Sequence, residues 1–458
     1  MKPTCTLIFD IGKTTKKALV FDESFHVLEE KTCTLPEGAD DDGFPCEDLG
    51  ELVRWVNDMV DYFFRRSGHS ISHINFSAYG ASIVCIDDSG NALMPFYNYL
   101  KKFPPGLEEQ FKTTYNNDGW IAEDTASPWL GMLNSGLQAY WLKYEKPHHF
   151  AKTKTLLHFP QYFPFLLTGK KMCDITSIGC HTMLWNFRQM HYHEWTEKEG
   201  IAKLFPFVTS PLEIFSKPFR GSEVTFGSGV HDSSAALMPY LVSMDEPFLL
   251  LSTGTWNICF NPFNADPLTA EELQKDCLSY LTYEGKPVKA SRIFLGHEHE
   301  VQQKALADFF SLNAEAHKAV PFDESIYQSL FRENDPNKTF IPLGMEGSGP
   351  IYQKQSGRTQ YDRFASYPEA QHQLIRDLVQ WQMLSIDLVD PRREIRKIIL
   401  VGGFSKSKLF IEILKREMND RVILQSDHPR ASALGAAWLV HKPEVYGPAS
   451  RLLQVKEA

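Results

Sequence analysis

The chain has 458 residues, of which 43% are hydrophobic and 13% aromatic; this is enough for two or three domains with large cores and excludes a disordered chain. Its net charge of −10 argues against a nucleic-acid partner, which would require a basic face. We find no signal-peptide pattern and no apolar run long enough to span a membrane, so we expect a cytoplasmic protein without membrane contact. The eight cysteines are scattered, contain no CxxC pair, and are expected to be reduced thiols without a metal.

The first elements along the chain are a strand, a small polar turn and a second strand. The first strand is apolar and ends in Asp10, and the second covers residues 17–22. Backbone N–H groups around Gly12 can surround an anion, and the hydroxyls of Thr14 and Thr15 add donors, so the turn is typical of a phosphate site. An ordinary hairpin explains the same pattern, and the turn alone does not decide between the two.

Alternating strands and amphipathic helices follow. Apolar residues at helical spacing predict a helix over residues 47–66, and a strand is predicted over residues 71–76. Further helices are predicted over residues 134–144, 160–167 and 197–205. This alternation indicates an α/β fold.

The stretch 226–236, read as FGSGVHDSSAA, has an acid at the centre of a loop. Gly227 and Gly229 would let a bulky ligand approach the main chain. Asp232 could accept a proton from a hydroxyl group, and Ser233 is predicted as the N-cap of the helix that follows. The alternative is that Asp232 is only a helix-capping residue.

The second half repeats the order of the first. Residues 247–251 form a buried strand, a turn containing Gly254 and Thr255 follows, and residues 256–260 form the next strand. A later strand, residues 395–401, runs into a Gly/Ser loop as the strand at residues 71–76 does. We therefore expect a duplicated α/β domain around one cleft, since ligands of such sheets bind beyond the carboxyl ends of the strands.

Five motifs together resemble the FGGY carbohydrate kinases, which belong to the superfamily of actin and hexokinase. The motifs are Asp10-Ile-Gly-Lys-Thr-Thr15, Gly229-Val-His-Asp232, Ser252-Thr-Gly-Thr255, Val401-Gly-Gly-Phe-Ser405 and Ala431-Ser-Ala-Leu-Gly435. Each motif is weak alone, but their order along nearly the whole chain is specific. The resemblance implies two duplicated actin/hexokinase-like (ribonuclease H-like) domains around a central cleft. Residues 1–240 would bind the sugar and carry the catalytic aspartate, and residues 241–458 would bind ATP.

The resemblance also implies a role for each site residue. Asp232 would be the catalytic base, and Asp10 would hold Mg²⁺. The residues expected to contact the nucleotide are Gly12, Thr14, Thr15, Gly254, Thr255, Gly402, Gly403 and Ser407. The residues expected to contact the sugar are Ser82, Asn134, Gln138, His231 and Ser233.

Within the family, Ser252-Thr-Gly-Thr-Trp256 and Asn134-Ser-Gly-Leu-Gln138 resemble motifs of rhamnulokinases. This resemblance implies phosphorylation of a ketose such as L-rhamnulose or L-fuculose at C1. The chain departs from the family pattern at Lys13, where most members have threonine, and at Ser82, Gln161 and Tyr283. Most of these changes lie on the sugar side, so another ketose or a polyol (xylulose, ribulose or a glycerol-like substrate) stays open. A catalytically silent sugar-binding sensor is the other alternative. The partners implied are the sugar and ATP, and a homodimer is left open.

Overall fold

The computed structural model describes residues 4–80, 82–115, 119–333, 335–345, 349–351, 357–426, 428–446 and 453–458. By their internal contacts the residues divide into two compact units. The first unit comprises Met1–Met244, Ser279–Pro287 and Arg430–Leu453, and the second comprises Asp245–Leu278, Val288–Pro429 and Gln454–Ala458. Two segments of the second half of the chain thus belong to the first unit, and the domain boundary at residues 240/241 stays a prediction.

A mixed sheet forms the centre of the first unit. Its strands, in sheet order, are β13 (Phe215–Phe219), β14 (Ser222–Phe226), β6 (Ser70–Ala78), β1 (Thr4–Ile11), β2 (Lys16–Phe21) and β3 (Val27–Cys33), and β15 (Val230–His231) also pairs with β6. β1 is antiparallel to β2 and parallel to β6, with Ile11 paired to Ala78. The polar turn after Asp10 therefore lies at the carboxyl end of both β1 and β6.

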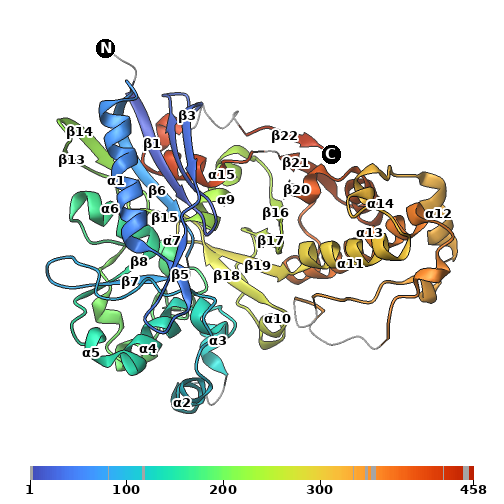
Figure 1. The fold of residues 1–458 in the computed structure, drawn as a ribbon, viewed down its shortest axis with the longest axis horizontal. Helices are drawn as coiled ribbons and strands as arrows, with labels where there is room; N and C mark the ends of the chain where they lie inside the picture. The colour runs from blue at the N-terminus through green and yellow to red at the C-terminus, as the bar shows by residue number, and fades with distance from the viewer. Residues whose placement is uncertain are drawn as a thin grey trace. The chain divides into compact units, whose positions relative to one another are not determined.

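Helices cover both faces of this sheet. The helices of the first unit are α1 (Leu49–Arg65), α2 (Pro105–Tyr115), α3 (Trp120–Asp124), α4 (Ser135–Glu145), α5 (Pro147–Phe150), α6 (Phe159–Thr168), α7 (Ile175–Ile178), α8 (Glu194–Lys198), α9 (Asp232–Ser243), α15 (Ala431–Leu439) and α16 (Pro443–Tyr446). Successive residues of a strand point to opposite faces, so Leu7 and Phe9 pack with α1 while Ile8 packs with α9 and α15. Figure 1 shows α1 on one side of β1 and β6, and α9 and α15 on the other.

Short strand pairs complete the first unit. They are β4 (Glu37–Ala39) with β5 (Pro45–Glu47), β7 (Ile83–Ile86) with β8 (Thr155–His158), β9 (Cys173–Asp174) with β12 (Val208–Thr209), and β10 (Trp185–Asn186) with β11 (His191–Tyr192).

The sheet of the second unit repeats the topology of the first. Its order is β18 (Cys277–Leu281), β19 (Pro287–Ile293), β17 (Asn257–Asn261), β16 (Phe248–Thr253), β20 (Lys397–Gly402), β21 (Val422–Ser426) and β22 (Val455–Glu457). β16 is antiparallel to β17 and parallel to β20, as β1 is to β2 and β6. β20 is parallel to β21, as β6 is to β14. The duplicated α/β fold is therefore confirmed.

The helices of the second unit are α10 (Ala270–Gln274), α11 (Leu295–Phe309), α12 (Glu324–Glu333), α13 (Tyr367–Val389) and α14 (Lys408–Glu417). α13 is the longest of them and packs against α11, α12 and α14 (Figure 1). Its buried residues, among them Leu374, Leu378 and Ile386, share one core with β16 and β20.

Two sequence expectations about helices are corrected. The helix predicted over residues 197–205 is broken: α8 ends at Lys198, and a separate 3₁₀ turn covers Ala202–Leu204. Gly200 between them has φ +67°, a left-handed conformation that a continuous α-helix does not contain. The helix predicted from residue 47 begins at Leu49, because the Asp48 side chain accepts a hydrogen bond from the Glu51 N–H and so acts as the N-cap.

Candidate active site

Asp232 follows two short strands, β14 and β15, which both pair with β6 and are separated by a segment that contains two glycines. β14 pairs with the first half of β6, and β15 pairs with its end, where Val230 is opposite Ser77. Between them Gly227 donates to the Ile74 carbonyl, and Gly229 donates to the side chain of Asn75. Asp232 is thereby delivered to the carboxyl end of β6, the edge of the sheet where ligands of α/β proteins bind.

The two glycines make room for the protein itself, which corrects the expectation that they admit a ligand. A Cβ on Gly227 would lie 2.4 Å from the Asn75 side chain, and one on Gly229 would lie 2.2 Å from the Pro160 carbonyl oxygen. Gly229 also has φ +78°. Any side chain at these positions would displace the loop that carries Asp232.

Asp232 is the first residue of α9, and the expectation that Ser233 is the N-cap was wrong. The N-cap is His231, with extended backbone at φ −64° and ψ 131°. The Asp232 side chain is 35% exposed, and its Oδ1 atom accepts from the Ser233 backbone N–H at 2.6 Å and lies 3.4 Å from His231 Nε2. A carboxylate at a helix N-terminus is stabilised by the helix dipole, and its exposure leaves it open to a substrate hydroxyl.

A buried polar network holds the backbone just before Asp232. The His231 N–H donates to the Thr176 hydroxyl at 3.1 Å, and the hydroxyl and N–H of Thr176 in turn donate to Asp174. Ser228 donates to the other oxygen of Asp174 at 2.9 Å. Burial raises the pKa of Asp174 to about 6, although the hydrogen bonds from Thr176 and Ser228 lower it. The sequence does not reveal this network, because Asp174 lies more than fifty residues from the loop that it supports.

Asp10 is the last residue but one of β1 and lies near enough to Asp232 for their charges to interact. Its Oδ1 atom accepts from the Ser432 hydroxyl at 3.0 Å, so the amino end of α15 contributes to this site. Burial raises the pKa of Asp10 to about 6; Ser432 and Lys17 lower it, and the charge of Asp232 raises it further. Two neighbouring, partly buried carboxylates fit a divalent cation with oxygen ligands, because a cation would offset both their desolvation and their mutual repulsion.

The first phosphate loop is a tight turn between β1 and β2. The Gly12 N–H donates to the Thr15 carbonyl at 3.1 Å, and the side chain of Thr14 is exposed while that of Thr15 is half-buried. The predicted phosphate contacts are therefore grouped within one turn, but only Thr14 is open to solvent, and the Gly12 N–H already has a partner inside the turn.

In the second unit, four of the predicted nucleotide residues line one pocket of about 760 Å³: Gly254, Thr255, Gly403 and Ser407. Gly402 does not line the pocket; it has φ +90°, and a Cβ on it would lie 1.9 Å from the Thr253 carbonyl oxygen. The Gly403 N–H donates to that same carbonyl at 2.8 Å. The structure thus brings the two glycine-containing loops together, and the pocket has the volume of a typical small-molecule site.

The sequence did not indicate several other residues of this pocket. Gln303 and Gln371 exchange amide hydrogen bonds of 2.8 and 2.6 Å, and Gln303 Nε2 lies 3.1 Å from His299 Nε2. Burial and the neighbouring His317 lower the pKa of His299 to about 4, so its imidazole is neutral at physiological pH. These groups offer both donors and acceptors to a planar heterocycle, and they come from α11 and α13, whose sequences resemble those of ordinary amphipathic helices.

The predicted sugar contacts do not form one accessible group. Asn134 and Gln138 are buried, and their amides bond to backbone: Asn134 to Leu130 and His181, and Gln138 to Ile83. Their similarity to rhamnulokinases therefore reports local structure rather than an exposed binding group. His231 is also buried and stacks on Tyr280 at 5.4 Å.

Two departures on the sugar side leave buried polar atoms without partners in the described part of the chain. The Gln161 amide donates to the Gly229 carbonyl at 2.6 Å, but its Oε1 atom accepts no hydrogen bond. The hydroxyl of Ser82 is likewise buried and unpaired. Buried polar groups are nearly always hydrogen-bonded, so each of these two atoms has capacity for one further polar partner.

Comparison with known families matches nearly the whole chain. The model described as "FGGY family of carbohydrate kinases, N-terminal domain" matches residues 5–227, and "Carbohydrate kinase FGGY, C-terminal domain" matches residues 245–448. The chain belongs to the FGGY family of carbohydrate kinases. Among the helices of the described residues, none is long and apolar enough to cross a membrane.

Curated relatives are rhamnulokinases of low identity. The enzyme of Halalkalibacterium halodurans is 25% identical over 202 residues, 42% of this chain and 42% of that protein. The rhamnulokinase of Bacteroides thetaiotaomicron is 22% identical over 233 residues, 49% of this chain and 47% of that protein. The matched segment thus spans about half the length of these relatives or less.

Solved structures with the same fold include kinases named for carbohydrate, gluconate and glycerol. A carbohydrate kinase from Novosphingobium aromaticivorans has a TM-score of 0.80 and 22% identity, over 96% of this chain and 92% of that one. Gluconate kinase from Lactobacillus acidophilus has a TM-score of 0.80 and 16% identity, over 100% and 93%. Plasmodium falciparum glycerol kinase with ADP has a TM-score of 0.78 and 16% identity, over 100% and 94%. At these identities the likeness concerns the fold.

Proposed function

We propose that the protein is an ATP-dependent carbohydrate kinase with Asp232 as its catalytic base. The observation that carries this proposal is the position of Asp232: it is the partly exposed first residue of α9, at the carboxyl end of β6, in a chain of the FGGY family. Asp10 and the first phosphate loop lie at the end of β1, which borders β6. A base and a phosphate-binding turn at one edge of a sheet are what phosphoryl transfer requires.

In the proposed reaction Asp232 accepts the proton of the attacking sugar hydroxyl. A bond forms between that oxygen and the γ-phosphorus of ATP, the bond from this phosphorus to the β–γ bridging oxygen breaks, and ADP leaves with the bridging oxygen. Gly12, Thr14 and Thr15 form the turn that would bind phosphate oxygens, through the two threonine hydroxyls and the N–H groups of the turn other than that of Gly12, which donates to Thr15. Asp10 would hold Mg²⁺, which neutralises phosphate charge when bound.

The nucleotide base would occupy the pocket of the second unit that Gly254, Thr255, Gly403 and Ser407 line. Its neutral His299 and the Gln303–Gln371 amide pair supply hydrogen bonds to the ring edge. A pocket of about 760 Å³ is large enough for an adenosine-sized ligand.

The substrate proposed is a ketose phosphorylated at its primary hydroxyl, with L-rhamnulose and L-fuculose as the first candidates. The rhamnulokinase relatives support this choice. Ser82 and Gln161 oppose it, because a site built to pair one hydroxyl pattern rejects others by about 10⁴–10⁵. Another ketose or a polyol is therefore the second candidate, supported by the unpaired Ser82 hydroxyl and Gln161 oxygen, which can pair with a different set of sugar hydroxyls.

A coupled ADP-release screen tests the proposal. The substrates should include L-rhamnulose, L-fuculose, xylulose, ribulose, gluconate and glycerol, and ³¹P NMR of the product identifies the phosphorylated hydroxyl. If the deoxyketoses rank far below xylulose, ribulose or a polyol in kcat/KM, the ketose assignment is wrong and the kinase assignment stands. Binding of a sugar without ATP turnover for any of them would favour the silent sensor instead.

A further inference from the structure

The hairpin of β4 and β5 contacts the predicted first phosphate loop through two ion pairs. β4 and β5 pair antiparallel with Glu37 opposite Glu47, so two carboxylates lie side by side on one hairpin. Each carboxylate binds one lysine of the loop region: Glu37 binds Lys13, and Glu47 binds Lys16. The two lysines bracket the predicted phosphate-binding hydroxyls of the loop.

The pair of Lys16 and Glu47 is buried and fixed. Lys16 is 2% exposed and Glu47 is 7% exposed, and the second carboxylate oxygen of Glu47 accepts from the Tyr79 hydroxyl. The Lys16 ammonium also donates to the backbone carbonyl of Lys13 at 2.8 Å. Removing either partner of this buried ion pair would leave an uncompensated charge, so Lys16 stays bound to Glu47. The hydrogen bond from Lys16 therefore holds the backbone carbonyl of Lys13 in place.

The pair of Lys13 and Glu37 has the opposite character. Its ammonium and carboxylate are 2.6 Å apart, but the side chains are 24% and 46% exposed. Ion pairs in contact with solvent contribute little to stability, because water screens the attraction and solvates each partner when they separate. The Lys13 side chain can therefore leave Glu37 while its backbone stays where Lys16 holds it.

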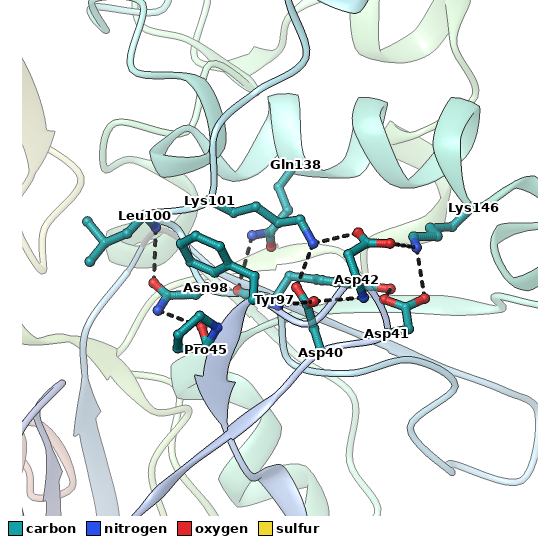
Figure 2. Close-up of polar contacts among 11 residues, drawn as sticks. Asp40, Asp41, Asp42, Pro45, Tyr97, Asn98, Leu100, Lys101, Gln138 and Lys146 are labelled. Atoms are coloured by element: carbon teal, nitrogen blue, oxygen red, sulfur yellow. Dashed lines mark hydrogen bonds and ion pairs between the residues drawn. The ribbon is translucent and has the colours of Figure 1, made fainter.

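The far end of the hairpin is anchored too. Asp40, Asp41 and Asp42 form its turn, and the ammonium groups of Lys101 and Lys146 lie among their carboxylates at 2.5 to 2.8 Å, as Figure 2 shows. Hydrogen bonds from both lysines lower the pKa of Asp42. The two lysines neutralise most of this acidic turn, so we assign it the role of fixing the hairpin.

We propose that Lys13 is a phosphate ligand of the nucleotide, held by Glu37 until a phosphate replaces the carboxylate. The inference rests on the proposed function and extends it to a residue where most family members have an uncharged threonine. Lysine forms charge-assisted hydrogen bonds with phosphate as it does with carboxylate. The phosphate chain of ATP carries more negative charge than one carboxylate, and the exposed pair with Glu37 is weak, so phosphate can displace Glu37. Glu37 would thus set the affinity for ATP by competing for the same ammonium.

The test is a double-mutant cycle on nucleotide binding, measured by calorimetry without sugar. Lys13→Thr should raise the Kd for ATP about tenfold and weaken its dependence on salt, because one cation–phosphate contact is lost. Glu37→Gln should lower the Kd about two- to threefold by freeing Lys13. In the Lys13→Thr background, Glu37→Gln should have no effect. Adenosine, which has no phosphate, should bind all four proteins equally.

Lys31→Thr is the matched control. Lys31 is an exposed lysine of the neighbouring strand β3, paired with Glu29 at 3.0 Å, and its replacement changes the net charge by the same amount. This control should bind ATP as the wild type does. An equal loss in both lysine variants would show a general charge effect and would overturn the proposal, as would additive effects of Lys13→Thr and Glu37→Gln.

The proposal and the kinase function fail in different ways. If the wild type turns over a sugar with ATP while Lys13→Thr has unchanged Kd, KM for ATP and salt dependence, only the Lys13 proposal is wrong. If the folded wild type binds no ATP, both are wrong. Melting temperatures of the variants check that each protein is folded.

Discussion

Asp10 and Asp232 flank strand β6 from opposite sides, because Asp10 on β1 and Val230 on β15 both pair with Ser77. They are close enough for the charge of Asp232 to raise the pKa of Asp10. Residues more than 200 positions apart thus form one acidic site at the carboxyl end of the central strand. The roles proposed for the two carboxylates differ, and the variants below separate them.

Asp232→Asn should keep the fold and sugar affinity but reduce kcat by about 10²–10⁴, because the amide cannot accept the proton of the sugar hydroxyl. The measurements are steady-state kinetics and calorimetry with the sugar that the screen identifies. Asp245→Asn, an exposed change just after the same helix, is the control. A kcat within threefold of the wild type would contradict the assignment of the base.

Asp10→Asn should lose most activity at saturating Mg²⁺ without a loss of thermal stability. The lost activity follows from the removed oxygen ligand. The retained stability follows because a partly buried carboxylate with a raised pKa is replaced by a neutral group that can still accept from Ser432. Turnover as a function of Mg²⁺ concentration and differential scanning calorimetry measure the two effects. Full activity of the variant at ordinary Mg²⁺ concentrations would refute the metal assignment.

Asp174 should make stability depend on pH. Its pKa is raised to about 6 in the folded protein, above the value of about 3.9 for an exposed aspartate, so the folded state binds the proton more tightly. Protonated Asp174 therefore adds its full contribution to the free energy of unfolding at low pH, and this contribution is lost as pH rises from about 4 to about 6. The shift sets an upper limit of about 3 kcal/mol on this loss.

Asp174→Asn removes the titrating group and tests this expectation. Urea unfolding of both proteins between pH 4 and 8 should show the stability of the wild type falling relative to the variant across that interval, whatever their difference at pH 4. Parallel curves would mean that Asp174 has the same pKa in the folded and unfolded states.

Gly435→Ala should destabilise the first unit by about 1–3 kcal/mol, the range for overpacked sites. A Cβ at Gly435 in α15 would lie 1.9 Å from the Ala235 carbonyl oxygen of α9, so the two helices would have to separate. The better helix propensity of alanine, worth about 1 kcal/mol, does not offset this clash. Gly106→Ala is the control, because Gly106 in α2 has no atom within 4 Å of the added Cβ. Equal stability of the two variants by urea unfolding would show that α9 and α15 tolerate separation.

The sequence by itself determined the class of fold and the motifs of the site. Alternating apolar strands, a polar turn after Asp10 and its repeat at Ser252–Thr255 are local patterns, and local patterns are what periodicity and turn chemistry reveal. The same reasoning located Asp232, since glycines and a helix start surround it in the chain. It failed for Ser233 and for the helix over residues 197–205, where one backbone conformation decides the boundary of the element.

Only the tertiary structure decided which distant residues meet. The contacts of Asp10 with Ser432, of Asp174 with the Asp232 loop and of Glu37 with Lys13 depend on strand register and chain reversal, which leave no mark on the residues between. Asn134 and Gln138 are also buried, and their side-chain amides are hydrogen-bonded to backbone groups. Nothing in the local sequence indicated these partners. Burial and hydrogen-bond partners depend on how distant strands and helices pack, so they cannot be predicted from one segment of the sequence.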